Sequence, residues 1–310
     1  MPIIIWTIQL ILIPALSPLG IGLIKNMKAK LQNRQGASIF QPYRDIWKLL
    51  HKDEVVSVDA SWIFRCAPYI VFGITIVVGA SIPLFSSLGQ GIISSDMLLV
   101  IYTLATGTFF LALAGIDTGS AFGGFGSSRE MTISALAEGG FIFSLLTLAL
   151  TRGTTNLFGI SAIPMSLYDQ SFLPTLLAFL GFFIVLLAET ARFPFDNPAT
   201  HLELTMIHEA MILEYSGKKL ALMEWASANK LLIFTALGAN LFFPFALAQS
   251  SMMGVVLIGI FAFIFKILVF YAAIAVLESS ISKFRFFRLP DLLLISFIFN
   301  IIAIGLLNYL

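Results

Sequence analysis

Residues 253–277 read MGVVLIGIFAFIFKILVFYAAIAVL, and Lys266 is the only charged side chain in this stretch. An apolar run of this length forms an α-helix that crosses the hydrocarbon core of a bilayer. A helix is favoured there because it satisfies its backbone hydrogen-bonding groups within one segment. The stretch therefore identifies an integral membrane protein.

Seven further apolar runs of similar length predict seven more transmembrane helices. The eight predicted spans are 3–24, 66–86, 96–115, 130–150, 172–191, 229–249, 253–277 and 289–310. The composition agrees, since 58% of the residues are hydrophobic and only 11% are charged. We therefore expect an all-α, polytopic membrane protein of about eight transmembrane helices, with residues 1–310 forming a single membrane domain.

The Lys and Arg residues gather in alternate loops of this topology. All but three of the 18 lie on one side, chiefly in the loops 25–65 and 192–228. Because basic loops remain in the cytoplasm, both loops are predicted to be cytoplasmic and both chain termini to face outward. The first span opens without a basic region, so we interpret it as an uncleaved helix rather than a signal peptide.

The cytoplasmic loop 25–65 contains a different helical pattern. Apolar residues alternate with polar ones at helical spacing over residues 39–50, which predicts an amphipathic helix in the membrane interface. This helix either anchors the loop or lines a pocket and docks a partner, and the pattern favours neither role. The candidates for docking or pocket lining in this loop are Arg34, Tyr43, Arg44, Asp45 and Trp47.

Carboxylates are concentrated between residues 189 and 224, in a chain with only 17 acidic residues. Acidic groups at a membrane are costly to desolvate, so a dense group of them indicates a functional site. A turn at residues 195–198 is predicted to precede a helix over about 199–213, which carries His201 and His208 on one face as further docking or pocket candidates. The acidic cytoplasmic loop 192–228 and its flank contain the proton-coupling candidates Glu189, Arg192, Asp196, Glu203, Glu209, Glu214 and Glu224.

Charged side chains within the predicted spans form a second group of proton-coupling candidates. Glu138 is expected about 12 Å inside the bilayer, eight residues beyond Glu130. Lys266 lies near the middle of its span, and Glu278 follows the end of the same span. Such groups are costly in lipid, so they indicate either a proton relay or a buried ion pair between Glu138 and Lys266.

Residues 119–126 are rich in glycine and lie between two predicted spans. They lack the preceding strand and the final G-K-S/T of a phosphate-binding loop, so we expect a tight surface loop. Ser127 or Ser128 is expected to cap the helix that follows.

The sequence shows no arrangement typical of a catalytic or metal site. Cys66 is the only cysteine, which excludes an intrachain disulfide, iron–sulfur cluster or thiolate metal site. No basic block suited to nucleic acid is present. Any redox cofactor is therefore expected on a partner protein.

Four short motifs in the loops resemble those of a known family. They are Asn33–Gly36 (NRQG), Gln41–Leu50 (QPYRDIWKLL), Asp117–Ser120 (DTGS) and Gly126–Glu130 (GSSRE). Together they are similar to the eight-helix membrane subunit shared by respiratory complex I and membrane-bound nickel–iron hydrogenases. The stretch 198–209 (PATHLELTMIHE) resembles the hydrogenase branch, whereas the stretch 34–38 (RQGAS) lacks the Pro-Asn of the complex I signature.

The resemblance implies a non-catalytic membrane subunit that supports a peripheral redox arm. It implies a NiFe centre and iron–sulfur clusters on hydrogenase large and small subunits and an iron–sulfur protein on the cytoplasmic side. It also implies antiporter-like membrane subunits as partners and a bacterial or archaeal cytoplasmic membrane as the location. The acidic residues resemble the family's acidic loop below the nearest cluster, where redox events are coupled to proton movement.

We therefore interpret the chain as the anchor and coupling subunit of a hydrogenase related to complex I, which links electron transfer to proton or sodium translocation. One alternative is a quinone-binding membrane subunit of an NADH:quinone oxidoreductase-like complex. The other is a stand-alone secondary ion transporter. The lack of an evident internal repeat disfavours the transporter.

Overall fold

The fold is described by a computed structural model that covers residues 2–163, 171–197 and 206–309. Within these residues the regular structure is helical and eight helices are long and apolar enough to cross a membrane, which confirms the predicted fold class. The long helices are α1 (Pro2–Leu31), α3 (Trp62–Ser81), α4 (Met97–Asp117), α5 (Ala121–Arg152), α7 (Phe172–Glu189), α9 (Gly217–Leu237), α10 (Met253–Ser280) and α11 (Leu289–Tyr309). The shorter elements are α2 (Gln41–Leu50), α6 (Leu157–Ala162), α8 (His208–Ile212), the π-helical turn η1 (Gly238–Phe242) and the 3-10 turn η2 (Phe286–Arg288).

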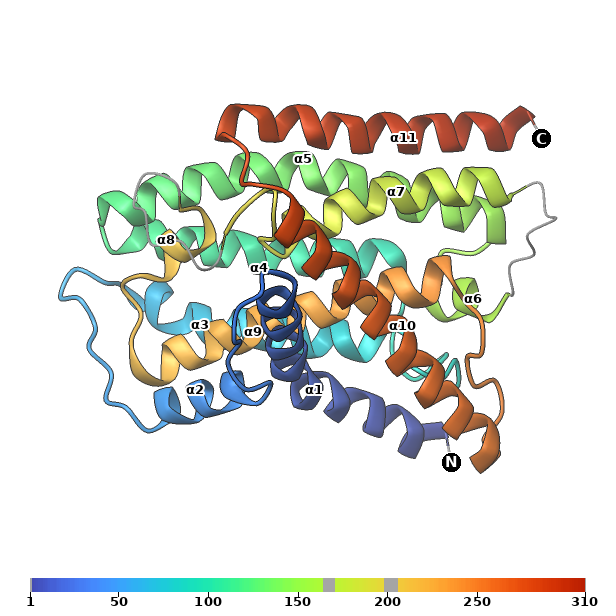
Figure 1. The fold of residues 1–310 in the computed structure, drawn as a ribbon, viewed down its shortest axis with the longest axis horizontal. Coiled ribbons are helices and arrows are strands. Elements are labelled where there is room, and N and C mark those ends of the chain that lie inside the picture. The colour runs from blue at the N-terminus through green and yellow to red at the C-terminus, as the bar shows by residue number, and fades with distance from the viewer. Residues whose placement is uncertain (1, 164–170, 198–205, 310) are drawn as a thin grey trace.

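The long helices form a bundle in which α11 lies along α5 and α7 at one edge (Figure 1). The more deeply buried α9 packs against α1 and α3, and α4 packs against α3 and α5. The start of α1 and the end of α11 lie at the same end of the bundle as α6, whereas α8 lies toward the opposite end (Figure 1). The two ends of the bundle therefore carry different short elements.

The glycine-rich stretch is helical from its third residue, so the prediction of a surface loop was wrong. α5 begins at Ala121, and Ser120 occupies the N-cap position in place of the predicted Ser127 or Ser128. Tertiary packing overrides the low helix propensity of glycine here. Glu130 consequently lies well inside the helix rather than in its first turn.

Gly123→Ala is expected to destabilise the protein, whereas the adjacent Gly124→Ala is expected to be nearly neutral. A Cβ on Gly123 would collide with the carbonyl oxygen of Gly115 on α4, while a Cβ on Gly124 would meet nothing within 4 Å. Overpacking of this kind costs about 1–3 kcal/mol, because the two helices must separate. Thermal unfolding of the purified variants measures the difference, and equal melting temperatures would contradict the close approach of α4 and α5.

α9 begins at Gly217, whereas the sequence predicted a span from residue 229. Charged residues in its first turns concealed the boundary, since they lower the local hydropathy. Lys219 lies 3.2 Å from Glu54 in the loop before α3, which ties this extension of α9 to the loop 25–65. Glu224 therefore lies on a helix and not in an extended loop.

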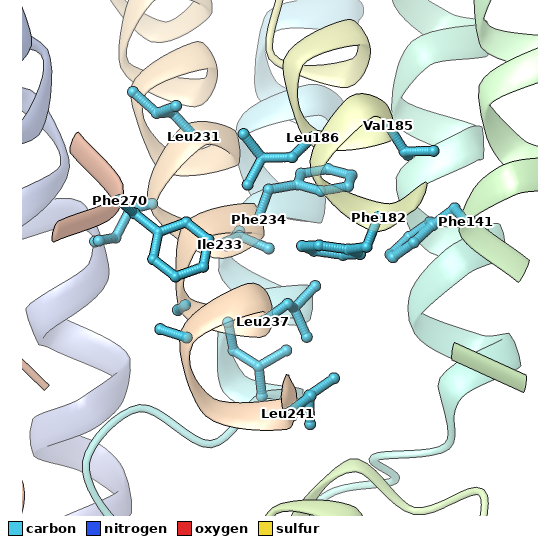
Figure 2. Close-up of a cluster of buried hydrophobic side chains, with 14 of the residues drawn as sticks. Phe141, Phe182, Val185, Leu186, Leu231, Ile233, Phe234, Leu237, Leu241 and Phe270 are labelled. Carbon is cyan, nitrogen blue, oxygen red and sulfur yellow. The ribbon is translucent and has the colours of Figure 1, made fainter. Parts of the chain in front are cut away.

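Aromatic packing holds α5, α7 and α9 together (Figure 2). The ring of Phe141 lies 5.1 Å from that of Phe234 and 6.0 Å from that of Phe182, measured between centroids. All three side chains are buried, and Leu237 and Leu241 continue the cluster along α9 and η1. The same three helices carry Glu130, Glu189 and Lys230, so this packing fixes the framework of the polar site.

Proline creates a second link, between α1 and α9. Pro18 has no backbone N–H, so the carbonyl of Pro14 one turn earlier lacks its usual helical partner. The indole Nε1 of Trp225 on α9 donates to this carbonyl at 2.9 Å. This hydrogen bond satisfies the carbonyl of Pro14 and fixes α1 against α9.

Candidate functional site

Two adjoining cavities meet at α8, α9 and the segment that follows α7. One extends toward α1 and α2, and the other extends toward α3, α4 and α5. The larger, here called the charged vestibule, has a volume of about 480 Å³. Its charged lining residues are Lys25, Asp45, Lys48, Lys52, Arg192, Asp196, Glu209 and Glu224. Acidic and basic side chains thus surround a space large enough for many water molecules.

The smaller cavity, here called the inner pocket, adjoins the vestibule and is also lined by α3, α4 and α5. Its volume of about 40 Å³ holds only a few water molecules. The residues that line both cavities are Thr190, Ala191, His208, Ile212 and Ser227. The charged residues of the inner pocket are Glu130, Glu189 and Lys230.

An ion pair connects two helices at the inner pocket. Glu189 is the last residue of α7, and its carboxylate lies 2.7 Å from the Nζ of Lys230 on α9. The Lys230 ammonium also donates to the hydroxyl of Thr108 on α4 at 3.4 Å. Three helices therefore meet at one cation, with Glu130 of α5 lining the same space.

Asp196 holds the turn after α7 against α8. One carboxylate oxygen accepts the backbone N–H of His208 at 3.0 Å, and the other lies 2.6 Å from the Nζ of Lys283. Asp196 is buried, so water weakens neither interaction. Of the helix predicted over 199–213, α8 is observed, while His201 and Glu203 lie outside the described residues.

A second buried carboxylate joins three segments beside the vestibule. Glu278, near the end of α10, lies 3.1 Å from Lys28 on α1 and 3.2 Å from Arg192 after α7. Glu278 and Arg192 are both buried. One carboxylate thus pairs with two cations, and one of them, Arg192, lines the vestibule.

His208 and Glu209 are adjacent on α8, and burial shifts the pKa of each toward its neutral form. Burial lowers the pKa of His208 to about 4, and the nearby Lys230 adds to the effect. Burial raises the pKa of Glu209 to about 7, and repulsion from Glu224 adds to it. At pH 7 the imidazole is therefore neutral, whereas the Glu209 carboxyl is poised to bind or release a proton.

We expect Glu209→Gln to remove part of the pH dependence of stability. The folded protein binds the Glu209 proton more tightly than the unfolded chain, so this stabilisation is full below the ordinary carboxyl pKa and is lost as the pH rises through about 7. The contribution of His208 has the opposite sign and is lost as the pH falls through about 4. Melting curves of the wild type and Glu209→Gln across this range measure the difference, and parallel pH profiles would contradict the raised pKa.

The remaining candidates in the loops 25–65 and 192–228 are spread over several surfaces. The Tyr43 hydroxyl donates a hydrogen bond to the carbonyl oxygen of Ala15 on α1. Arg34 and Glu214 are exposed and line neither cavity. A separate hollow on α2 is lined by Tyr43, Arg44, Trp47 and Lys48.

The structure replaces the considered ion pair between Glu138 and Lys266 with two other interactions. The Nζ of Lys266 donates to the side-chain oxygen of Asn240 at 3.1 Å and lies 4.3 Å from the centroid of the Phe245 ring. The Glu138 carboxylate accepts a hydrogen bond from Ser134, one turn earlier on α5, at 3.4 Å. Glu138 and Lys266 therefore interact with different partners rather than with each other.

Sequence reasoning missed the lysines that complete the buried ion pairs. Lys230 was visible as a charge at the start of the predicted span 229–249, and a carboxylate at the end of another span is a natural partner for it. Lys28 contributed to the sequence analysis only as one of the basic residues that set the predicted orientation in the membrane. The partners of both lysines are distant in sequence, so only helix packing brings them together.

Comparisons with known proteins agree with this architecture. A family model described as NADH dehydrogenase matches residues 3–308. Hydrogenase-4 component C from Escherichia coli strain K12 is 34% identical over 278 residues, which cover 90% of this chain and 87% of the relative. Formate hydrogenlyase subunit 4 from the same strain is 29% identical over 299 residues, which cover 96% of this chain and 95% of the relative.

Two further matches extend this relationship. A subunit of NADH-quinone oxidoreductase from Paraburkholderia xenovorans strain LB400 is 31% identical over 221 residues, which cover 68% of this chain and 62% of the relative. A solved structure of the membrane-bound sulfane sulfur reductase, an archaeal respiratory membrane complex, contains a chain of the same fold, with a TM-score of 0.78 at 19% identity over 97% of this chain and 99% of that chain. Because the family model spans nearly the whole sequence, the chain belongs to the NADH dehydrogenase family.

Proposed function

We propose that this chain is the integral membrane anchor and coupling subunit of a multi-subunit hydrogenase related to complex I. Its similarity to hydrogenase-4 component C and to formate hydrogenlyase subunit 4, over most of the length of each, supports the hydrogenase branch. In this proposal the α8 end of the bundle docks a peripheral arm. The subunit then links electron transfer in that arm to proton or sodium translocation.

The observation that carries the proposal is that the charged vestibule and the inner pocket adjoin and share five lining residues. Glu209 faces the vestibule, and its pKa of about 7 suits it to exchange protons. Electron transfer on a docked partner changes the charge near the vestibule, and carboxyl groups there respond by binding or releasing a proton. Glu130 and the Glu189–Lys230 pair then pass the proton into the bundle through water in the inner pocket.

The redox cofactors belong to the partner proteins in this proposal. A NiFe centre and iron–sulfur clusters reside on large, small and iron–sulfur subunits at the cytoplasmic side, and antiporter-like subunits lie alongside in a bacterial or archaeal cytoplasmic membrane. Both chain termini then face outward, which fits their position at one common end of the bundle (Figure 1). Among the described residues, no group of three or more His, Cys, Asp or Glu side chains could hold a metal ion.

Quinone binding is the second candidate function, and the size of the vestibule favours it. A cavity of about 480 Å³ is large enough for the ring of a small ligand. The similarity to a subunit of NADH-quinone oxidoreductase points in the same direction. The dense charge on the vestibule wall nevertheless suits water and protons better than an apolar quinone tail.

Purification of the tagged chain from native membranes in mild detergent, followed by mass spectrometry, tests the proposal. We expect hydrogenase and iron–sulfur subunits to co-purify, and hydrogen turnover by the complex to resist quinone-site inhibitors. Inhibition by those compounds would favour the quinone-binding alternative. Recovery of the chain alone or as a homo-oligomer would contradict the proposal and favour a transporter.

A further inference from the structure

A separate hollow lies on the outer surface of α2, and of its lining residues only Lys48 also borders the charged vestibule. Its volume is about 470 Å³, and it is lined by Tyr43, Arg44, Trp47 and Lys48. Trp47 is 66% exposed, and its ring packs against His51 with 4.5 Å between centroids. The hollow thus combines two cationic side chains with an exposed aromatic ring.

The protein supplies little negative charge to the cations of this hollow. Arg44 and Lys48 are exposed and lie one helical turn apart, and neither forms an ion pair within the described part of the chain. The carboxylate of Asp45 instead accepts a hydrogen bond from Gln41 at 2.7 Å and lines the vestibule, which Lys48 also borders. Like charges at this spacing repel each other, so the hollow favours a bound anion.

The position of α2 places the hollow beside the apolar part of the bundle. The Tyr43 hydroxyl donates a hydrogen bond to the carbonyl of Ala15, so α2 packs along the candidate membrane-spanning segment Ile3–Leu31. Phe40 is also exposed and lies on the same face of α2 as Trp47. Exposed aromatic and basic side chains together are typical of the lipid headgroup region.

We infer that the hollow binds the headgroup of an anionic phospholipid. Arg44 and Lys48 donate charge-assisted hydrogen bonds to the phosphate oxygens, and Trp47 packs against the glycerol region, where an amphipathic ring is favoured. The exposed rings of Phe40 and Trp47 beside the two cations favour a lipid over the acidic surface of a soluble protein, because aromatic rings are stabilised at the boundary between headgroups and acyl chains. A lipid held here supports α2 where it forms one wall of the charged vestibule.

Native mass spectrometry of the full chain, released from nanodiscs of phosphatidylglycerol or phosphatidylcholine, tests this inference. We expect the wild type to retain phosphatidylglycerol, and Arg44→Gln/Lys48→Gln to retain it roughly thirtyfold more weakly. This estimate follows because each basic residue near an anionic surface contributes a factor of about five. The control Arg285→Gln/Arg288→Gln removes two exposed arginines of another basic segment and should retain the lipid as the wild type does.

Unchanged retention by Arg44→Gln/Lys48→Gln, or equal retention of both lipids by the wild type, would overturn the inference. Loss of a protein partner with unchanged lipid retention would overturn it in favour of an acidic protein surface. Brominated phosphatidylglycerol gives a second readout that does not depend on the double variant folding. It should quench the fluorescence of the wild type more than that of Trp47→Phe, and equal quenching would also overturn the inference.

Discussion

Glu278→Gln is expected to destabilise the protein by about 3–5 kcal/mol, the usual cost of removing one partner of a buried ion pair. The carboxylate lies between Lys28 and Arg192, at 3.1 and 3.2 Å. Neutralising it leaves two cations facing each other, and the buried Arg192 cannot regain its hydration. Thermal unfolding of the purified chain measures the loss.

Asp291→Asn is the matched control for this change. Asp291 is an exposed carboxylate in the first turn of α11, so the same acid-to-amide substitution there should shift the melting temperature only slightly. Combining Glu278→Gln with Arg192→Met should recover part of the loss, because it removes one of the two unpaired cations. A melting temperature of Glu278→Gln equal to that of the wild type would show that the three charges do not stabilise the fold.

Glu189→Gln is expected to reduce the rate of ion translocation by roughly a hundredfold. This is the lower end of the rate contribution that a positioned proton-transfer group makes. Its carboxylate lies 2.7 Å from Lys230 at the inner pocket, the narrowest described part of the proposed path. The amide keeps the shape of the side chain but can no longer carry the proton. Proton uptake per hydrogen produced, measured in vesicles containing the whole complex, reports the effect.

A second variant separates this functional loss from simple destabilisation. Glu189→Gln/Lys230→Met removes both charges of the pair, so it should regain stability relative to Glu189→Gln alone. Translocation should remain low, because the titratable carboxyl is still absent. Asp59→Asn, an exposed carboxylate on the same predicted side of the membrane, is the control and should translocate normally. Full translocation by Glu189→Gln in an assembled complex would refute the proposed path.

The sequence predicted the membrane helices well where hydropathy alone decides, and poorly where packing decides. The span 253–277 corresponds to α10 almost residue for residue, because a run of apolar side chains leaves no other stable structure in lipid. The predicted start of α5 was wrong because a glycine-rich sequence such as residues 119–126 is typical of a loop. Residues 121–126 are nevertheless helical, and α4 and α5 approach so closely that only glycine fits at Gly123.

For the candidate site too, the sequence predicted which segment is involved but not which side chains meet. Composition and periodicity identified the acidic segment, and Glu189, Asp196, His208 and Glu209 do lie together around two adjoining cavities. The sequence could not identify their partners. Lys230 lies 41 positions after Glu189, and their pairing depends on how α7 and α9 pack against the aromatic cluster (Figure 2).

The sequence by itself determined that the chain is a bundle of eight membrane-spanning helices with its charge gathered in a few segments, because desolvation acts on each segment independently. Only the tertiary structure decided which charges meet. Glu278 joins Lys28 and Arg192 because three segments converge beside the vestibule, whereas Lys266 bonds to Asn240 rather than to Glu138. Such pairings depend on the rotation and crossing of helices, which side-chain packing sets and local sequence does not encode.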